Sequence, residues 1–290
     1  MTLDDTAPTT TLTDGWKANF DDIYDQPDPR RYLAELGKLG YGIPHHGQQL
    51  FGALLAARPT AFAEPPVVLD LCCSYGINAA LMTCDVSLDD LEQHYAACAE
   101  LSPEDLVETD RSWYAEHRLA DAPVVAGLDV SEQAVAYGEK VGLLQPGVVE
   151  NLEVDPVSAG LAPVVAGADL ITVTGGVGYI TAATFAHLLE QTGDGPPPWV
   201  AAFILRQLSY HDIADVLAEH GLVTERLTGR TFPQRRFASE SEQEFTLRHL
   251  GESGLGTDGL ESDGLLHTEF YLSRPAAEVA ATPLSALVPA

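Results

Sequence analysis

The sequence predicts an α/β protein with a doubly wound, mostly parallel sheet of seven strands. Two observations favour this class: short runs of apolar and β-branched residues recur along the chain, and segments with helical periodicity separate them. We find no internal repeat. Alternation of this kind implies right-handed crossovers with helices on both faces of the sheet. A binding site is therefore expected beyond the carboxyl ends of the strands.

Six strands can be placed directly from apolar runs. Continuous runs such as PVVLDL and DLITVT are typical of strands covered on both faces. The expected strands are residues 66–71, 123–128, 169–174, 199–205, 223–227 and 266–272. Between them, Ser131 and Thr181 are suited to begin helices, and a third helix runs from His211 to His220 before Gly221.

Two further helical segments depart from simple alternation. Residues 15–59 precede the first strand and are expected to form a cap or lid, and residues 81–121 form an inserted group of two or three helices. In the cap, Trp16, Phe20 and Tyr24 have the spacing of one helix face, which favours a core role over a lid face above a ligand.

The remaining boundaries follow from composition. Residues 60–274 are expected to form the α/β domain that contains the insertion. Residues 1–14 and 275–290 lack periodicity and are expected to be mobile ends.

Composition excludes several partners. The chain has 15 Lys and Arg residues against 43 Asp and Glu, for a formal charge of −28. This balance argues against nucleic acid and anionic membrane, because both are bound by clustered basic residues. No apolar stretch is long enough for a membrane span, and the acidic start is unlike a signal peptide, so a cytoplasmic protein is expected. The four cysteines lack zinc-site spacing, and no metal site is expected.

The first strand leads into a turn suited to nucleotide binding. Residues 70–80 read DLCCSYGINAA, a strand followed by a tight turn of small residues and then a helix. Small residues allow backbone N–H groups to approach a ligand, and the helix N-terminus supplies further donors. The next strand ends at Asp129, where a carboxylate can accept hydrogen bonds from both hydroxyls of a ribose. The alternative role for Asp129 is to cap the helix that begins near Ser131.

These residues resemble class I S-adenosylmethionine-dependent methyltransferases over residues 60–274. The resemblance implies a final antiparallel strand at 266–272, S-adenosylmethionine as cofactor, and a set of cofactor contacts. It makes Asp70 the first-motif acid, Asp129 the ribose acid and Asn151 the adenine-side residue. The other implied cofactor-binding residues are Cys72, Ser74, Tyr75, Gly76, Val130, Thr174 and Gly175. Cys72 and Ser74 stand where the family has glycine, which narrows the backbone approach and brings a thiol to the site.

Other residues are candidates for contact with a small-molecule substrate. His45 and His46 follow a Gly/Pro break in the cap, and either imidazole could accept a proton from a methyl acceptor. Arg206 follows an apolar strand and is suited to an anionic group, unless it forms a salt bridge. Tyr179, Tyr210 and His211 complete this set. The basic residues around 226–236 either pair with acids or form a rim for an anionic substrate or acidic partner.

The leading function is a small-molecule S-adenosylmethionine-dependent methyltransferase of specialised metabolism. One alternative is an enzyme on the same fold that does not use S-adenosylmethionine. It would catalyse a positioned displacement or an intramolecular cyclisation, with Arg206 or Arg230 stabilising an anionic leaving group. A second alternative is a non-catalytic binding or scaffold subunit. The sequence leaves open a homodimer or a small partner subunit.

Overall fold

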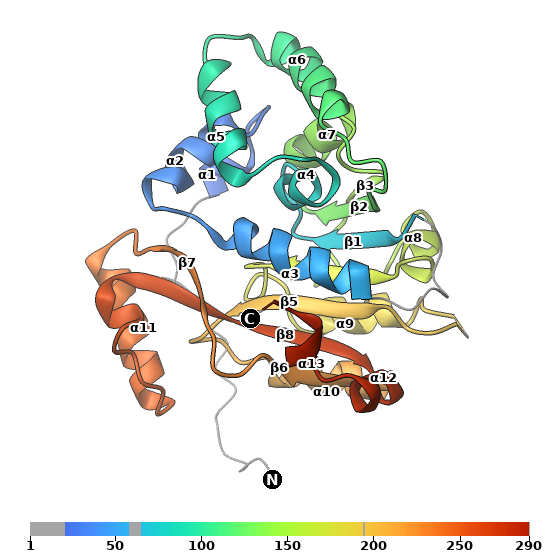
Figure 1. The fold of residues 1–290 in the computed structure, drawn as a ribbon, viewed down its shortest axis with the longest axis vertical. Helices are drawn as coiled ribbons and strands as arrows, with labels where there is room; N and C mark the ends of the chain where they lie inside the picture. Colours follow the sequence, from blue (N-terminus) through green and yellow to red (C-terminus); the bar gives the residue numbers. More distant parts are fainter. Residues whose placement is uncertain (1–20, 58–64, 194, 290) are drawn as a thin grey trace.

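The computed structural model describes residues 21–57, 65–193 and 195–289, so residues 1–14, Trp16 and Phe20 lie outside the described residues. Its centre is a twisted sheet of eight strands in the order β3-β2-β1-β4-β5-β8-β6, with β7 also paired to β8 (Figure 1). The strands are β1 (Val67–Leu71), β2 (Val124–Asp129), β3 (Gly147–Val149), β4 (Leu170–Thr174), β5 (Trp199–Leu205), β6 (Leu222–Arg226), β7 (Phe232–Arg236) and β8 (Leu265–Pro275).

The sheet is parallel from β3 to β5 and antiparallel beyond it. In the parallel part, β1 lies between β2 and β4, with Val68 opposite Val125 on one side and Leu170 on the other. The last strand, β8, inserts antiparallel between β5 and β6. This arrangement confirms the predicted doubly wound sheet and its final antiparallel strand, although the sheet has eight strands instead of seven. Sequence patterns missed β3, which has three residues, and β7, whose FPQRR sequence carries no apolar run.

Helices cover both faces of the sheet. They are α1 (Asp21–Tyr24), α2 (Arg30–Lys38), α3 (Ile43–Ala57), α4 (Ile77–Thr83), α5 (Leu88–Ala97), α6 (Pro103–Glu116), α7 (Glu132–Lys140), α8 (Ala162–Ala166), α9 (Ala182–Leu189), α10 (His211–Glu219), α11 (Glu240–Glu252), α12 (Ala276–Ala281) and α13 (Leu284–Leu287), with a 3₁₀ turn η1 (Glu261–Asp263). In Figure 1, α3 lies across the front of the sheet, and α5 and α6 extend above α4.

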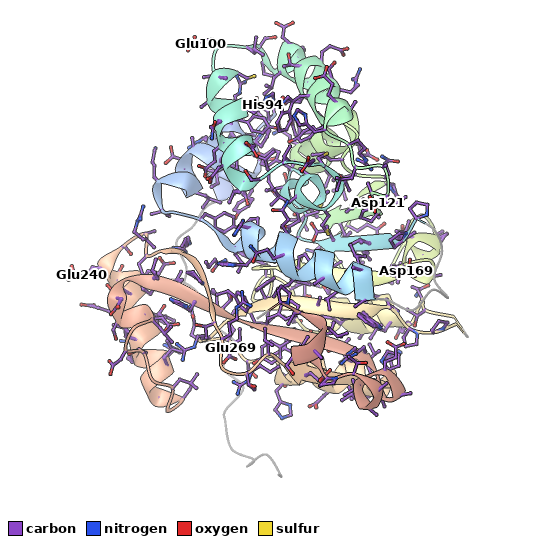
Figure 2. All side chains as sticks on the ribbon, viewed as in Figure 1. His94, Glu100, Asp121, Asp169, Glu240 and Glu269 are labelled. Carbon is purple, nitrogen blue, oxygen red and sulfur yellow. The ribbon has the colours of Figure 1, made fainter. Side chains whose placement is uncertain are left out.

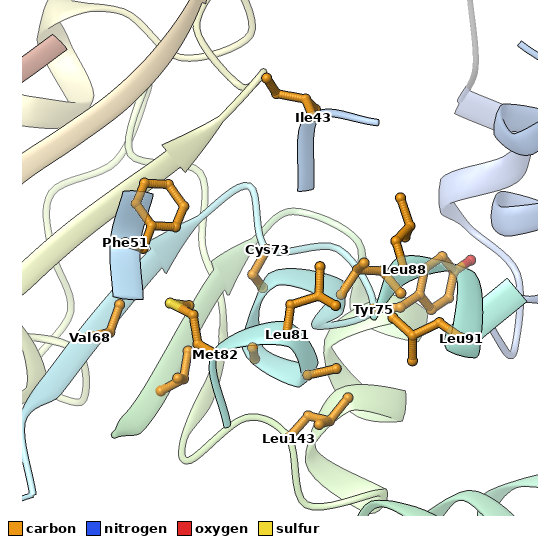
Figure 3. Packing of buried hydrophobic residues seen from close by; sticks show 14 of the residues in the cluster. Ile43, Phe51, Val68, Cys73, Tyr75, Leu81, Met82, Leu88, Leu91 and Leu143 are labelled. Atoms are coloured by element: carbon orange, nitrogen blue, oxygen red, sulfur yellow. The ribbon is translucent and has the colours of Figure 1, made fainter. Parts of the chain in front are cut away.

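Alternation along the strands creates two apolar cores. Val68 faces the core beneath α3, α4 and α7, whereas Leu69, its neighbour, faces the core beneath α8, α9 and α10. Figure 3 shows the first core, in which Phe51 of α3 and Met82 of α4 pack beside Val68. Because both faces are buried, β1 reads as a continuous apolar run, as the sequence suggested.

The insertion is fixed to the domain by a buried polar network. His94 of α5 lies 2.6 Å from the carboxylate of Asp110 in α6, and Figure 2 shows His94 between these helices. The other oxygen of Asp110 accepts a hydrogen bond from Tyr137 of α7, and Tyr95 bonds to the same phenol. Asp110 is fully buried, so these partners replace the water that its carboxylate loses on folding.

The carboxyl-terminal segment, expected to be a mobile end, contains two short helices. Residues 276–287 form α12 and α13, and the side chains of Leu284 and Val288 are buried. Glu278 of α12 accepts a hydrogen bond from Trp199, and the backbone N–H of Leu284 donates to Glu225 of β6. Small residues and proline therefore mark two short docked helices here.

The outer surface carries many of the acids. Figure 2 shows Glu100, Asp121 and Glu240 at the periphery of the molecule, where all three are exposed. Across the described ranges, no helix combines the length and the apolar character that crossing a membrane requires.

Glycine at position 127 is required by close packing in β2. A Cβ added there would lie 2.6 Å from the Cys73 sulfur and 2.8 Å from Leu144. We expect Gly127→Ala to lower the free energy of unfolding by about 1–3 kcal/mol, measured by urea denaturation. In the control Gly52→Ala, in α3, no atom lies within 4 Å of the new methyl group. This control should stabilise by about 0.5–1 kcal/mol. Equal effects of the two substitutions would contradict the packing account.

Candidate functional site

A pocket of about 790 Å³ opens at the carboxyl ends of β1, β2 and β4. Its lining comes from the turn after β1, from the loops after β2, β3 and β4, and from the cap and β7. The lining residues are Tyr24, Asp25, Tyr32, Leu36, Tyr41, Pro44, Leu71, Cys72, Cys73, Ser74, Ile77, Asn78, Leu128, Asp129, Val130, Ser131, Glu132, Gln133, Glu150, Asn151, Leu152, Glu153, Thr174, Gly175, Gly176, Tyr179, Ile180, Thr184, Gln234 and Arg235.

The turn after β1 has left-handed backbone at alternate positions. Cys72 has a φ of 54°, Ser74 a φ of 49° and Gly76 a φ of 81°. Only glycine adopts this conformation without penalty, and a non-glycine residue there costs roughly 1–2 kcal/mol. Two residues with side chains therefore adopt the backbone conformation that glycine adopts most readily.

Two glycines, one in β2 and one in the loop after β4, make room for the two thiols. A Cβ on Gly176, after β4, would lie 2.7 Å from the sulfur of Cys72. Gly127 gives the same clearance to Cys73, whose side chain points into the apolar core in Figure 3. Burial raises the pKa of the Cys73 thiol well above its ordinary value, so it stays protonated. The side chain of Cys73 therefore serves to pack the apolar core.

Asp129 connects the turn to the next helix. One of its carboxylate oxygens accepts a hydrogen bond of 2.8 Å from the backbone N–H of Ser74, and the other accepts one of 3.0 Å from Ser131. Each oxygen retains a further lone pair. Ser131 itself caps α7 through its side chain, so Asp129 is not the cap of that helix. The half-buried carboxylate can still accept two hydroxyl groups from a ligand.

Asp70 lies beneath the pocket and does not line it. Its carboxylate accepts hydrogen bonds from Thr172 at 2.7 Å and from Asn78 at 3.4 Å. Burial is the largest influence and raises its pKa from 3.8 to about 7, although both hydrogen bonds oppose that shift. Asn78 lines the pocket, so its hydrogen bond connects Asp70 to the pocket surface.

Tyr75 and Gly76 also lie below the pocket. The Tyr75 hydroxyl accepts from the backbone N–H of Gln26 and lies 3.1 Å from the carbonyl oxygen of Ile23, within hydrogen-bonding distance. Ser131 donates to the carbonyl of Tyr24. These bonds fix the segment after α1 against the domain. Tyr75 does not line the pocket, and its hydroxyl holds the segment that carries Tyr24 to the pocket.

Four buried polar atoms in the pocket lining have no hydrogen-bond partner within the protein. Among the described residues, these atoms are Ser74 Oγ, Asn78 Oδ1, Thr174 Oγ1 and Gln234 Oε1, and no described residue pairs with them. Buried polar atoms are almost always paired, and an unpaired one costs roughly 1–3 kcal/mol. Their convergence on one pocket indicates a polar ligand with several hydrogen-bonding groups.

The charge of the pocket is strongly one-sided. Its lining acids are Asp25, Asp129, Glu132, Glu150 and Glu153, and Arg235 is the one Lys or Arg among the described lining residues. Arg235 is buried in a two-point ion pair with Glu242, with N–O distances of 2.9 and 2.6 Å. Glu153 accepts hydrogen bonds from Thr181 and Thr184; burial acts to raise its pKa, but these bonds outweigh burial and lower it. The pocket therefore favours a cationic group.

The structure brings together part of the predicted site. The predicted residues that line the pocket are Cys72, Ser74, Asp129, Val130, Asn151, Thr174, Gly175 and Tyr179. Sequence reasoning missed Tyr32, Tyr41, Gln234 and Arg235. They come from α2, the loop before α3, and β7, which are remote in sequence from the turn. The aromatic spacing that included Tyr24 was the one available signal, and it favoured a core.

The predicted histidines are not at the pocket. His45 is exposed beside Gln49, and His46 packs edge-on against Phe232 with ring centroids 5.3 Å apart. Burial, followed by the nearby His45 and Arg230, lowers the pKa of His46 to about 4. His46 faces Phe232 of β7 and neither histidine lines the pocket, so neither residue can be assigned as a base.

The predicted substrate contacts after β5 also lie elsewhere. Arg206 forms an ion pair of 2.5 Å with the fully buried Glu261, which matches its salt-bridge alternative. Tyr210 is buried against Tyr271, with ring centroids 4.7 Å apart, and the exposed His211 pairs with Asp215. Arg206 contacts η1, Tyr210 contacts β8 and His211 pairs within α10. None of the three lines the pocket.

The basic residues around 226–236 are also engaged within the protein. Arg226 pairs with Glu269, Arg230 donates to the carbonyl of Pro289, and Arg236 donates to the carbonyl of Lys38. With Arg235 bound to Glu242, this segment holds the fold together. It lends no support to an anion-attracting rim.

No family model matches the sequence, and no curated protein matches it. Solved structures with a similar fold include the YcgJ protein from Bacillus subtilis, 9% identical, covering 80% of this chain and 98% of that chain with a TM-score of 0.47. A magnesium protoporphyrin IX methyltransferase from Synechocystis with bound SAM is 12% identical, covering 89% and 93% with a TM-score of 0.41. A TehB-like SAM-dependent methyltransferase from Corynebacterium glutamicum is 16% identical, covering 83% and 92% with a TM-score of 0.40.

The raised pKa of Asp70 predicts a pH dependence of stability. Between about pH 4 and 7 the folded protein binds more protons at this group than the unfolded chain, so its contribution to the free energy of unfolding falls as pH rises. Asp70→Asn removes this fall. The variant should gain stability relative to the unmodified protein, by on the order of a few kcal/mol, between about pH 5 and pH 8.

Urea denaturation across this range measures the effect. Asp121→Asn, which changes an exposed carboxylate, serves as the control and should leave the pH profile unchanged. Parallel profiles for Asp70→Asn and the unmodified protein would show that Asp70 ionises normally in the fold.

Proposed function

We propose that this protein is an S-adenosylmethionine-dependent methyltransferase that acts on a small molecule of specialised metabolism. The observation that carries the proposal is Asp129, a strand-end carboxylate whose two oxygens bond to Ser74 and Ser131 while keeping lone pairs toward an acidic pocket. The fold and the left-handed turn after β1 support the same assignment. Residues of the cap also line the pocket, which favours a small acceptor over a macromolecular one.

The charge of the pocket distinguishes this cofactor from others that use the same fold. A dinucleotide brings a pyrophosphate, which would face the lining carboxylates with Arg235 already paired to Glu242. S-adenosylmethionine instead carries a positive sulfonium and an ammonium group. Opposite charges in a pocket of low dielectric attract strongly, so the acidic lining favours the sulfonium compound.

Each part of the cofactor has suitable residues in the pocket. Asp129 would accept the ribose hydroxyls, and Asn151 with the loop after β3 would border the adenine. Ser74 and Asn78 would supply hydrogen bonds to the amino-acid part through their unpartnered atoms. When bound, the cofactor supplies a methyl group on a positively charged sulfur, which becomes a neutral thioether after transfer.

The protein's own contribution is positioning and exclusion of water. Aligning two reactants in a closed pocket removes much of the entropic barrier to a displacement. No histidine or lysine occurs among the lining residues that the structure describes. We therefore propose that the methylated atom offers its lone pair near neutral pH without proton removal by an imidazole.

Binding of S-adenosylhomocysteine tests the proposal. At about 100 times its dissociation constant the ligand should stabilise the fold by ~2.7 kcal/mol, which raises Tm by on the order of 5 °C. Asp129→Asn keeps the size of the side chain but removes its charge, and it should lose most of this shift.

The matched control is Asp155→Asn, an exposed acid on a loop near the pocket that does not line it. It should retain the shift. If saturating S-adenosylhomocysteine leaves Tm unchanged and calorimetry detects no heat, the methyltransferase proposal is wrong.

A further inference from the structure

We infer that one side of the pocket is an acceptor subsite for an uncharged, planar heteroaromatic molecule whose polar edge carries both a hydrogen-bond donor and an acceptor. This inference rests on the proposed function and specifies its substrate class. The aromatic half is defined here as Tyr24, Tyr32, Leu36, Tyr41, Pro44, Gln234 and Arg235, all of which line the pocket.

Aromatic rings form the walls of this half. Tyr24 and Tyr32 meet edge to face with centroids 5.4 Å apart, and Tyr32 meets Tyr41 in the same way at 6.1 Å. Burial raises the pKa of all three phenols, so each wall is uncharged near neutral pH. Aromatic rings in this arrangement favour stacking and edge contacts with another flat ring.

Gln234 supplies the polar end of the aromatic half. This residue of β7 is 4% exposed, and its Oε1 has no hydrogen-bond partner. Its amide reaches the end of β4, where a Cβ on Gly175 would lie 2.7 Å from Gln234 Nε2. Glycine at 175 is therefore required for this approach as well as for its φ of 75°.

Thr174 completes the polar edge. Its buried Oγ1, adjacent in sequence to Gly175, also lacks a partner. An amide and a hydroxyl together offer a donor and an acceptor, whichever way the amide is turned. A ligand edge with one N–H and one C=O would satisfy both, whereas a hydrocarbon would leave them unpaired.

The charges in the aromatic half exclude an ionic ligand. Arg235 is buried and its charge is balanced by Glu242 at 2.6 Å. An anion would lack an available counterion among the described residues of this half, and it would face Asp129 across the pocket. A cation would be desolvated among neutral phenols and beside the Arg235 guanidinium. Burial of an unpaired charge costs more than a neutral hydrogen-bonded edge, so the neutral form is preferred.

Three compounds on one bicyclic frame test this inference. 2-Quinolone is neutral and carries an N–H and a C=O side by side on one edge, quinoline-4-carboxylate is an anion, and 4-aminoquinoline is a cation near neutral pH. Calorimetric titration of the unmodified protein should show 2-quinolone binding at least about tenfold more tightly than either ion. Absence of 2-quinolone binding, or equal binding of either ion, overturns the inference.

Variants locate the contact. Gln234→Met keeps the length of the side chain and removes its hydrogen bonds, so it should weaken 2-quinolone binding by about tenfold. Gln207→Met is the matched control, because Gln207 also has a buried, unpartnered amide oxygen but does not line the pocket. Unchanged binding in Gln234→Met, or an equal loss in Gln207→Met, contradicts the assignment.

The same titrations separate this inference from the proposed function. Asp129→Asn should lose S-adenosylhomocysteine but retain 2-quinolone, because Asp129 is not among the residues of the aromatic half. If S-adenosylhomocysteine binds and 2-quinolone does not, the methyltransferase proposal stands and the substrate class is wrong. If 2-quinolone alone binds, the cofactor assignment fails and the subsite remains.

Discussion

The pocket depends on one carboxylate, Asp129, which holds two backbone N–H groups from different segments. Its bond to Ser74 fixes the turn after β1, and its bond to Ser131 fixes the start of α7. Ser131 in turn binds the carbonyl of Tyr24, so the cap is linked to the same point. A charged acceptor of two backbone donors is stronger than a neutral one, and this partly buried carboxylate stabilises three segments at once. The ligand-facing surface is shaped by this junction before any ligand binds.

The turn after β1 combines left-handed backbone with residues that carry side chains. Cys72 and Ser74 both have positive φ, and the space for the two adjacent thiols comes from glycines in neighbouring segments. Gly176 clears the sulfur of Cys72, and Gly127 clears that of Cys73. At interior packing density a side chain fits only where a facing residue leaves a similar volume. The two glycines that face the turn are therefore part of what allows its sequence.

The sheet was largely predictable from sequence because its buried strands are continuous apolar runs, and β1, β2, β4 and β5 begin and end within one residue of expectation. The acidic side of the pocket was predictable for a related reason, since Ser74 and Asp129 follow strands whose ends meet at one edge. The aromatic half was not, because β7 is polar in sequence and places Gln234 beside β4 only through its pairing with β8. Arg206 misled for the opposite reason: it follows a clear strand, but Glu261, remote in sequence, neutralises it.

The scarcity of bases has a consequence for ligand choice. Of 15 Lys and Arg residues against 43 acids, several are consumed in ion pairs that hold elements together, among them Arg206 with Glu261, Arg235 with Glu242 and Arg274 with Glu225. Arg235, the one Lys or Arg among the described lining residues, is thus neutralised by Glu242, and the lining carboxylates keep a net negative charge. A pocket of that kind gains most from a ligand that brings its own positive charge. The charge imbalance of the whole chain thus reappears locally in the lining of the pocket.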